Sequence, residues 1–389
     1  MIRSALLLCA AFLLATAFAC APALAPPPLF GGGPSALSWP LANCDAVSFA
    51  NAVQMAQPFP LLTTQAPAAN GAVQRNMWTD LQAAFAMAPP FFQKQLCDLN
   101  GVYVSGDSDS WGFRNPNTGQ KFIAVTQDLW NDTPDIPGTS PARAAAIPYA
   151  TFENRILKAL LEGWTGPQHP LGPFNPSDSA RTVLAALAHE YGHVLWYDTY
   201  VPNYGKEAHF EDFCSDGTTT FYTGSWENPT TNEPPPSYSP GSRWRSFGDI
   251  AVTKLVDDVA VRVLQTSVPA PGKPDTRGAG KMLHRIYGLR PPYGQGTGRW
   301  AGLFAAFSPQ EDFVETFKLF VLRKAPTAPL ISLKIHVPIF LGTPADADIP
   351  YSCSSRPVLQ SKLACFQNRF CADADPLTQA CGFGCAPKP

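Results

Sequence analysis

Residues 179 to about 197 have the pattern of a long apolar helix, and Ser177-Asp178 precedes it as a cap. The same segment carries His189, Glu190 and His193. Two imidazoles and a carboxylate are costly to bury in an apolar helix unless they have partners. Residues four apart lie on one helix face, with Cβ atoms about 5–6 Å apart, so the two rings can point at a common ligand.

A divalent metal ion is the partner that this spacing favours. Zn²⁺ takes imidazole nitrogens at about 2.0–2.1 Å, a distance that two histidines one helical turn apart can provide. Glu190 follows the first histidine directly, and it can therefore act as a general base toward a water molecule at the metal. We therefore expect Zn²⁺ as the cofactor, His189 and His193 as metal ligands and Glu190 as the catalytic residue.

The run His189-Glu190-Tyr191-Gly192-His193 resembles the HExxH motif of the zinc metallopeptidases called zincins. The resemblance implies an α+β, zincin-like domain with a mixed sheet before the histidine helix and a more helical second half. It also implies hydrolysis of peptide bonds. The metzincin type is excluded, because Trp196 and Thr199 stand where that type has a glycine and a third histidine.

A catalytic zinc site needs a third protein ligand, and Glu311 is the first candidate. Ser308 and Pro309 open a helical pattern in which Glu311 and Glu315 share one face. The segment resembles the third-ligand helix of the anthrax lethal-factor type within the gluzincins. That resemblance implies Glu311 as the ligand and Glu315 as the support of a ligand histidine. Alternatively, Glu311 only closes a capping box with Ser308, and Glu315 is the ligand.

A second candidate for the third ligand lies closer to the motif. Glu211 and Asp212 follow His193 at a spacing that resembles the thermolysin type, although Asp212, rather than Glu211, stands four residues before Asp216. The threonine-rich run after them does not favour a helix, so Glu311 is preferred.

A donor to the oxyanion of the transition state is also expected. Tyr287 and Tyr293 are candidates for this role, and the sequence does not choose between them.

The N-terminus has the features of a secretory signal peptide over residues 1–25. Arg3 precedes an apolar run over residues 5–19, and small-residue cleavage sites follow it. The run also loosely resembles a lipoprotein signal that would leave a lipid anchor at Cys20, so the predicted location is secreted or periplasmic, with an outer-membrane-type lipoprotein as the alternative. The net charge of −2 and the absence of a Lys/Arg run argue against a nucleic-acid partner. No later segment has 18 consecutive apolar residues, so we expect no transmembrane segment.

The number and positions of the cysteines indicate how the rest of the chain is organised. Without Cys9 and Cys20, eight of the ten cysteines remain, which suggests up to four disulfides in an oxidising compartment. Five of them follow Pro350. We therefore expect a catalytic domain over residues 26–345, with strands near residues 102–104 and 121–126, and a small disulfide-rich segment over residues 346–389.

These observations predict a secreted zinc metallopeptidase that acts on a protein or peptide substrate. Two alternatives stay open. The first is an exported binding or adhesion protein on a zincin scaffold whose metal is structural or absent. The second is an amidase that acts on cell-wall peptide.

Overall fold

The computed structural model describes part of the chain in detail. The described residues are 38–56, 68–106, 110–115, 117–131, 172–173, 179–200, 221, 226–227, 245–246, 300–302, 304–306, 309–326, 332–337, 345–350 and 357–370. The predicted signal segment, including Cys20, lies outside them. Among the described helices, none has the length and apolar character needed to cross a membrane.

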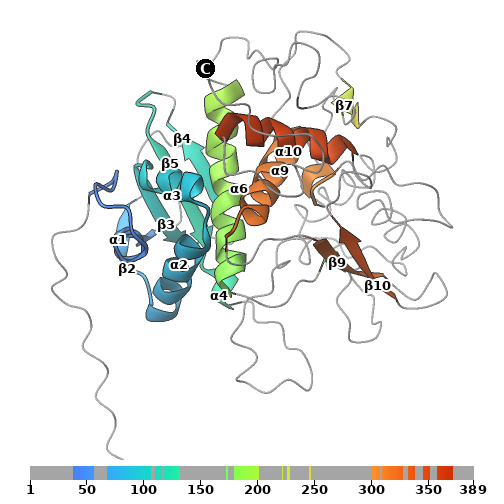
Figure 1. Cartoon of the computed structure of the whole chain (residues 1–389). Coiled ribbons are helices and arrows are strands. Elements are labelled where there is room, and N and C mark those ends of the chain that lie inside the picture. The colour runs from blue at the N-terminus through green and yellow to red at the C-terminus, as the bar shows by residue number, and fades with distance from the viewer. Residues whose placement is uncertain are drawn as a thin grey trace, which may run out of the picture. The chain divides into compact units, whose positions relative to one another are not determined.

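A five-stranded mixed sheet with the strand order β2-β1-β3-β5-β4 precedes the histidine helix in the sequence (Figure 1). Its three inner strands run parallel, and each edge strand pairs antiparallel with its neighbour. The strands are β1 (Gln54–Ala56), β2 (Ala69–Ala72), β3 (Gly101–Ser105), β4 (Trp111–Arg114) and β5 (Lys121–Thr126). The expected α+β class and mixed sheet are therefore confirmed, and β3 and β5 match the two predicted strands.

Four helices accompany this sheet in the first part of the chain. They are α1 (Ala46–Ala52), α2 (Arg75–Met87), α3 (Pro90–Cys97) and α4 (Asp128–Asn131). Asp45 begins α1 as a side-chain cap, because its Oδ1 accepts a hydrogen bond of 2.8 Å from the Ser48 amide. A disulfide joins Cys44 to Cys97 at the end of α3, which agrees with the expectation that cysteines of this chain are oxidised.

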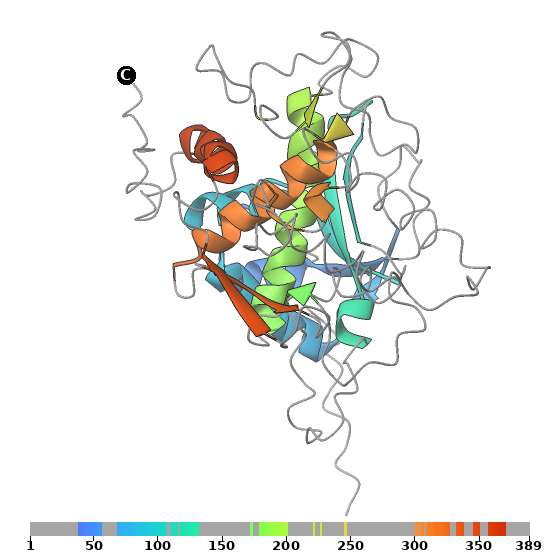
Figure 2. The ribbon, with the colours of Figure 1, turned by 90° about the vertical axis from the view of Figure 1, so that its right-hand side faces the viewer.

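The histidine helix α6 (Ser179–Tyr200) contacts β4 and β5 of the sheet and also α9 (Pro309–Arg323). Figure 1 shows α6, in green, between the strands and α9, and Figure 2 shows α9 crossing α6. Because both sides are covered, residues 182–188 of α6 are all buried. This explains why the helix is apolar nearly all round instead of amphipathic.

The described part of the second half contains helices and strands. Helix α9 contacts α10 (Pro357–Phe370) and the 3₁₀ turn η2 (Phe304–Ala306). A three-stranded sheet of β10 (Ala345–Pro350), β9 (Ser332–Val337) and β6 (Gly172–Pro173), and a pair of β7 (Trp226–Glu227) and β8 (Arg245–Ser246), were not predicted. Strand β10 spans the predicted boundary at residue 345.

Aromatic side chains join the helices into one core. Phe92 of α3 packs edge-on against Tyr191 of α6 at 5.6 Å between ring centroids, and also against Phe317 of α9 at 5.8 Å. Phe317 in turn contacts Phe366 of α10 at 5.4 Å. Helices α3 and α10 are thereby held to α6 and α9, the two helices that carry the candidate site.

Candidate metal centre

Helix α6 places the two histidines of the HExxH motif side by side. Their ring centroids are 5.0 Å apart, as expected for residues one turn apart. The side chains of His189 and His193 keep 19% and 16% of their surface exposed, whereas the neighbouring residues of α6 are buried. The rings therefore lie at the edge of the core, where a ligand from solvent can reach them.

Helix α9 brings Glu311 to both rings. Its Oε2 lies 3.7 Å from Nε2 of His189, and its Oε1 lies 3.7 Å from Nε2 of His193. These separations are too long for hydrogen bonds. Ligand atoms about 2.1 Å from a tetrahedral zinc ion are about 3.4 Å from one another. The spacing therefore suits atoms that bind one ion better than it suits direct contact.

The donor set also fits zinc. Among the described residues, His189, His193 and Glu311 form a group that could hold a metal ion, with ligand atoms within 4.8 Å of one another. Two imidazole nitrogens and one carboxylate are a common protein ligand set of catalytic zinc sites, in which the fourth position stays open.

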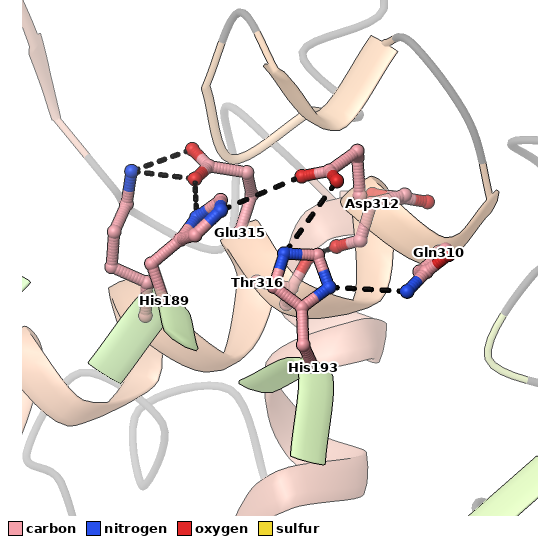
Figure 3. Close-up of polar contacts among 8 residues, drawn as sticks. His189, His193, Gln310, Asp312, Glu315 and Thr316 are labelled. Carbon is pink, nitrogen blue, oxygen red and sulfur yellow. Dashed lines mark hydrogen bonds and ion pairs between the residues drawn. The ribbon is translucent and has the colours of Figure 1, made fainter. Parts of the chain in front are cut away.

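Glu315 supports His189 from the far side of the ring. Its Oε1 lies 2.7 Å from Nδ1 of His189 (Figure 3). Lys318 donates hydrogen bonds of 2.7 Å to both oxygens of Glu315. Carboxylates that accept the second N–H of a ligand histidine fix its tautomer and orient the ring. Lys318 was not predicted. It stands three residues after Glu315, a spacing at which oppositely charged side chains on a helix meet.

Gln310 lies beside the other histidine, and the sequence analysis missed it. Its side-chain amide is 3.1 Å from Nδ1 of His193 (Figure 3). The only sequence signal was its place directly before Glu311, in the first turn of α9.

The charges around His189 have the opposite effect on its pKa from burial. Burial lowers the pKa of this histidine, but the hydrogen bond to Glu315 and the charges of Glu190 and Glu311 outweigh that effect and raise the pKa to about 9. Burial and the charge of His189 lower the pKa of His193 to about 3. In the absence of metal, one ring is therefore cationic and the other is neutral at pH 7.

The two glutamates of α9, Glu311 and Glu315, also have pKa values that are shifted in opposite directions. Burial raises the pKa of Glu311 to about 7, although the charge of His189 opposes the shift. Burial also acts to raise the pKa of Glu315, but the charge of Lys318 and the hydrogen bond with His189 lower it to about 2. Glu315 is thus ionised at neutral pH, whereas Glu311 exchanges a proton near neutrality.

Glu190, the expected general base, is buried to 3% exposure, and its charge contributes to the raised pKa of His189. Strand β4 passes directly over its backbone. A Cβ atom on Gly112 would lie 1.9 Å from the carbonyl oxygen of Glu190. Only glycine therefore allows the strand and the helix to come this close at the motif.

Gly192 has a similar role on the opposite side of α6. A Cβ atom there would lie 3.1 Å from Cα and from Cγ1 of Val314. Val314 lies between Glu311 and Glu315 along α9, and Gly192 lies between Glu190 and His193 along α6. The two helices are therefore in close contact at the site, and the helix spacing there determines the distances between the candidate ligands.

A buried ion pair lies directly beside Glu311 in the chain. Lys362 of α10 donates hydrogen bonds of 2.8 and 2.6 Å to the carboxylate of Asp312, and both side chains are at most 1% exposed. The ammonium group also lies 4.9 Å from the ring centroid of Trp300, within the range of a cation–π interaction. The pair connects α10 to the turn of α9 that carries Glu311.

The other predicted site residues lie outside the described part of the chain. They are the alternative third ligands Glu211 and Asp212 and the candidate oxyanion donors Tyr287 and Tyr293. The structure brings together His189, His193, Glu311 and Glu315, and it adds Gln310 and Lys318. Comparisons with protein-family models, with curated proteins and with solved structures found no match to this chain.

Proposed function

We propose that this chain is an exported, zinc-dependent peptidase on a zincin-like scaffold. His189, His193 and Glu311 would hold the zinc ion. The observation that carries the proposal is the pair of 3.7 Å separations between the Glu311 oxygens and the two Nε2 atoms. They bring the two histidines of an HExxH helix and a glutamate of a second helix to one point.

The chemistry divides between the metal and Glu190. When bound, zinc polarises a carbonyl group and lowers the pKa of water from ~15.7 to about 7. Glu190 follows the ligand His189 directly, so its carboxylate is the base that takes the proton as water attacks the peptide carbonyl. The same carboxyl group then donates that proton to the nitrogen of the departing amine, and the C–N bond breaks.

Two further observations support export. The N-terminal pattern is typical of a signal peptide, and the Cys44–Cys97 disulfide agrees with an oxidising compartment. The substrate class follows from the resemblance of the HExxH segment to zinc peptidases. Alternatively, the exported chain is a lipoprotein that is anchored to a membrane through a lipid on Cys20.

The direct test is zinc content together with chelator-sensitive hydrolysis. The purified protein is expected to contain stoichiometric zinc and to cleave a peptide library, and a chelator should abolish cleavage until zinc is restored. Glu311→Ala is expected to purify with substoichiometric zinc, whereas Asp98→Ala, a change at an exposed carboxylate, keeps it. Zinc without cleavage of any peptide would favour a binding protein, and cleavage restricted to cell-wall peptide would favour an amidase.

Zinc affinity is expected to rise with pH, because zinc displaces protons from its ligands. His189 must be neutral and Glu311 ionised to bind, and their metal-free pKa values are about 9 and about 7. Each displaced proton contributes about tenfold per pH unit. The affinity should therefore rise steeply up to about pH 7, more gently up to about pH 9, and then level off.

Chelator competition across this range measures the slope of the affinity. Calorimetry in buffers of different ionisation enthalpy counts the protons released. An affinity that does not change between pH 6 and pH 9 would contradict the raised pKa values of His189 and Glu311.

A further inference from the structure

Helix α9 supplies more to the site than Glu311. Both Nε2 atoms of the histidines face Glu311 at 3.7 Å, so both Nδ1 atoms point away from the candidate metal position. Each Nδ1 atom has a contact from α9: Glu315 lies 2.7 Å from that of His189, and Gln310 lies 3.1 Å from that of His193. Residues of α9 thus lie beside both ring nitrogens of each histidine.

Metal binding determines where the proton of each ring lies. A neutral imidazole that binds a metal through Nε2 carries its proton on Nδ1 and needs an acceptor there. Glu315 satisfies this need for His189, since an ionised carboxylate only accepts hydrogen bonds.

Gln310 can satisfy it for His193 in one orientation only. The structure places the amide nitrogen Nε2 of Gln310 next to Nδ1 of His193. That arrangement requires the ring proton on Nε2, where it would prevent metal binding. The nitrogen and oxygen of a side-chain amide have nearly the same shape, and the hydrogen-bond network decides their assignment. Turning the amide places Oε1 at the same point, as an acceptor.

We propose that Gln310 is a positioning residue that accepts a hydrogen bond from Nδ1–H of His193 through Oε1. The inference rests on the proposed zinc site. In this arrangement the two histidines have different hydrogen-bond acceptors at Nδ1. His189 has the anionic carboxylate of Glu315, which pairs with Lys318, whereas His193 has the neutral amide of Gln310. Because Gln310 is buried, water does not readily replace the amide as acceptor.

Zinc affinity of matched variants tests this role. Gln310→Leu removes the acceptor and is expected to weaken zinc binding by about 10- to 100-fold, the range for residues that support a ligand histidine. Gln310→Glu keeps an acceptor oxygen and should recover most of that loss. Gln93→Leu is the control, because it removes a partly buried amide that donates to carbonyl groups at the end of α2, and it should leave zinc affinity unchanged. Circular dichroism of the metal-free proteins checks folding.

Nitrogen NMR of the histidine rings gives a second readout, and its first measurement uses the wild type alone. In the zinc-loaded wild type, Nδ1 of His193 is expected to carry a proton that exchanges slowly with solvent. In Gln310→Leu, that proton should exchange faster. If Gln310→Leu does not fold, the wild-type spectrum and Gln310→Glu decide the question.

Several results would overturn the inference. An unprotonated Nδ1 of His193 in the zinc-loaded protein is one, and unchanged zinc affinity in Gln310→Leu is another. A third is Gln310→Glu binding zinc no better than Gln310→Leu. If Glu311→Ala loses zinc while Gln310→Leu does not, only the role of Gln310 fails. If the wild type takes up no zinc, the proposed function fails as well.

Discussion

Glu190→Gln is expected to bind zinc like the wild type and to hydrolyse peptides about 10²- to 10⁴-fold more slowly, the contribution typical of a general acid–base residue. Glutamine has almost the shape of glutamate, but its amide cannot take a proton from water at neutral pH. Glu190 is buried beside His189, so a change of shape would disturb the site, and the glutamine variant avoids it. The loss should therefore appear in kcat.

Zinc content and kcat/KM on one peptide substrate, measured on the same preparation, check this expectation. Asp98→Asn is the matched control, because it makes the same chemical change at an exposed carboxylate that pairs with Lys94, and it should change neither value. A Glu190→Gln protein that cleaves at the wild-type rate would remove Glu190 from the mechanism. One that loses its zinc would indicate that Glu190 is needed for the site itself.

The two helices that carry the site were predictable from sequence because their signals are local. The apolar pattern that begins at Ser179 predicts α6. The run Pro309-Gln310-Glu311 marks the start of α9, and the predicted helix ends close to the observed last residue, Arg323. On each helix, the residues that meet are one turn apart, so spacing alone places the two histidines on one face and Glu311 with Glu315 on another.

The missed strands have weaker local signals. Strand β2 has the sequence Ala-Asn-Gly-Ala, and these residues are poor strand formers. In β4, the aromatic residues Trp111 and Phe113 favour a strand, but the poor strand former Gly112 separates them. Pairing partners elsewhere in the sheet determine their conformation. For Gly112, the close approach to Glu190 requires a residue without a side chain, and a tertiary contact of this kind leaves no pattern in the sequence around it.

Helix α10 has a local signal in the sequence. Leu359, Leu363, Phe366 and Phe370 follow at helical spacing, inside the segment that was predicted only as disulfide-rich. Cys365 on this helix is disulfide-bonded. The burial of Lys362 could not have been predicted, because lysine is almost never fully buried without a partner, and its partner Asp312 is 50 residues away.

Lys362→Met is expected to lower the free energy of unfolding by about 3–5 kcal/mol, the usual effect of removing one member of a buried ion pair. Methionine keeps most of the length of the lysine side chain, so the main loss is the ammonium group, which bonds both oxygens of Asp312 and lies over the Trp300 ring. The carboxylate then stays buried without that countercharge. Urea unfolding of the metal-free protein measures the change without a contribution from bound zinc.

The double variant Lys362→Met with Asp312→Leu shows whether charge is the cause. Replacing both members of a buried pair by apolar side chains is often close to neutral, so the double variant should be more stable than either single variant. Lys94→Met is the control at an exposed pair, where about 0–1 kcal/mol is expected. If Lys362→Met loses no more stability than Lys94→Met, the buried pair does not hold α10 to α9. A large loss that the double variant recovers would mean that a charge on the C-terminal helix α10 stabilises the turn that presents Glu311.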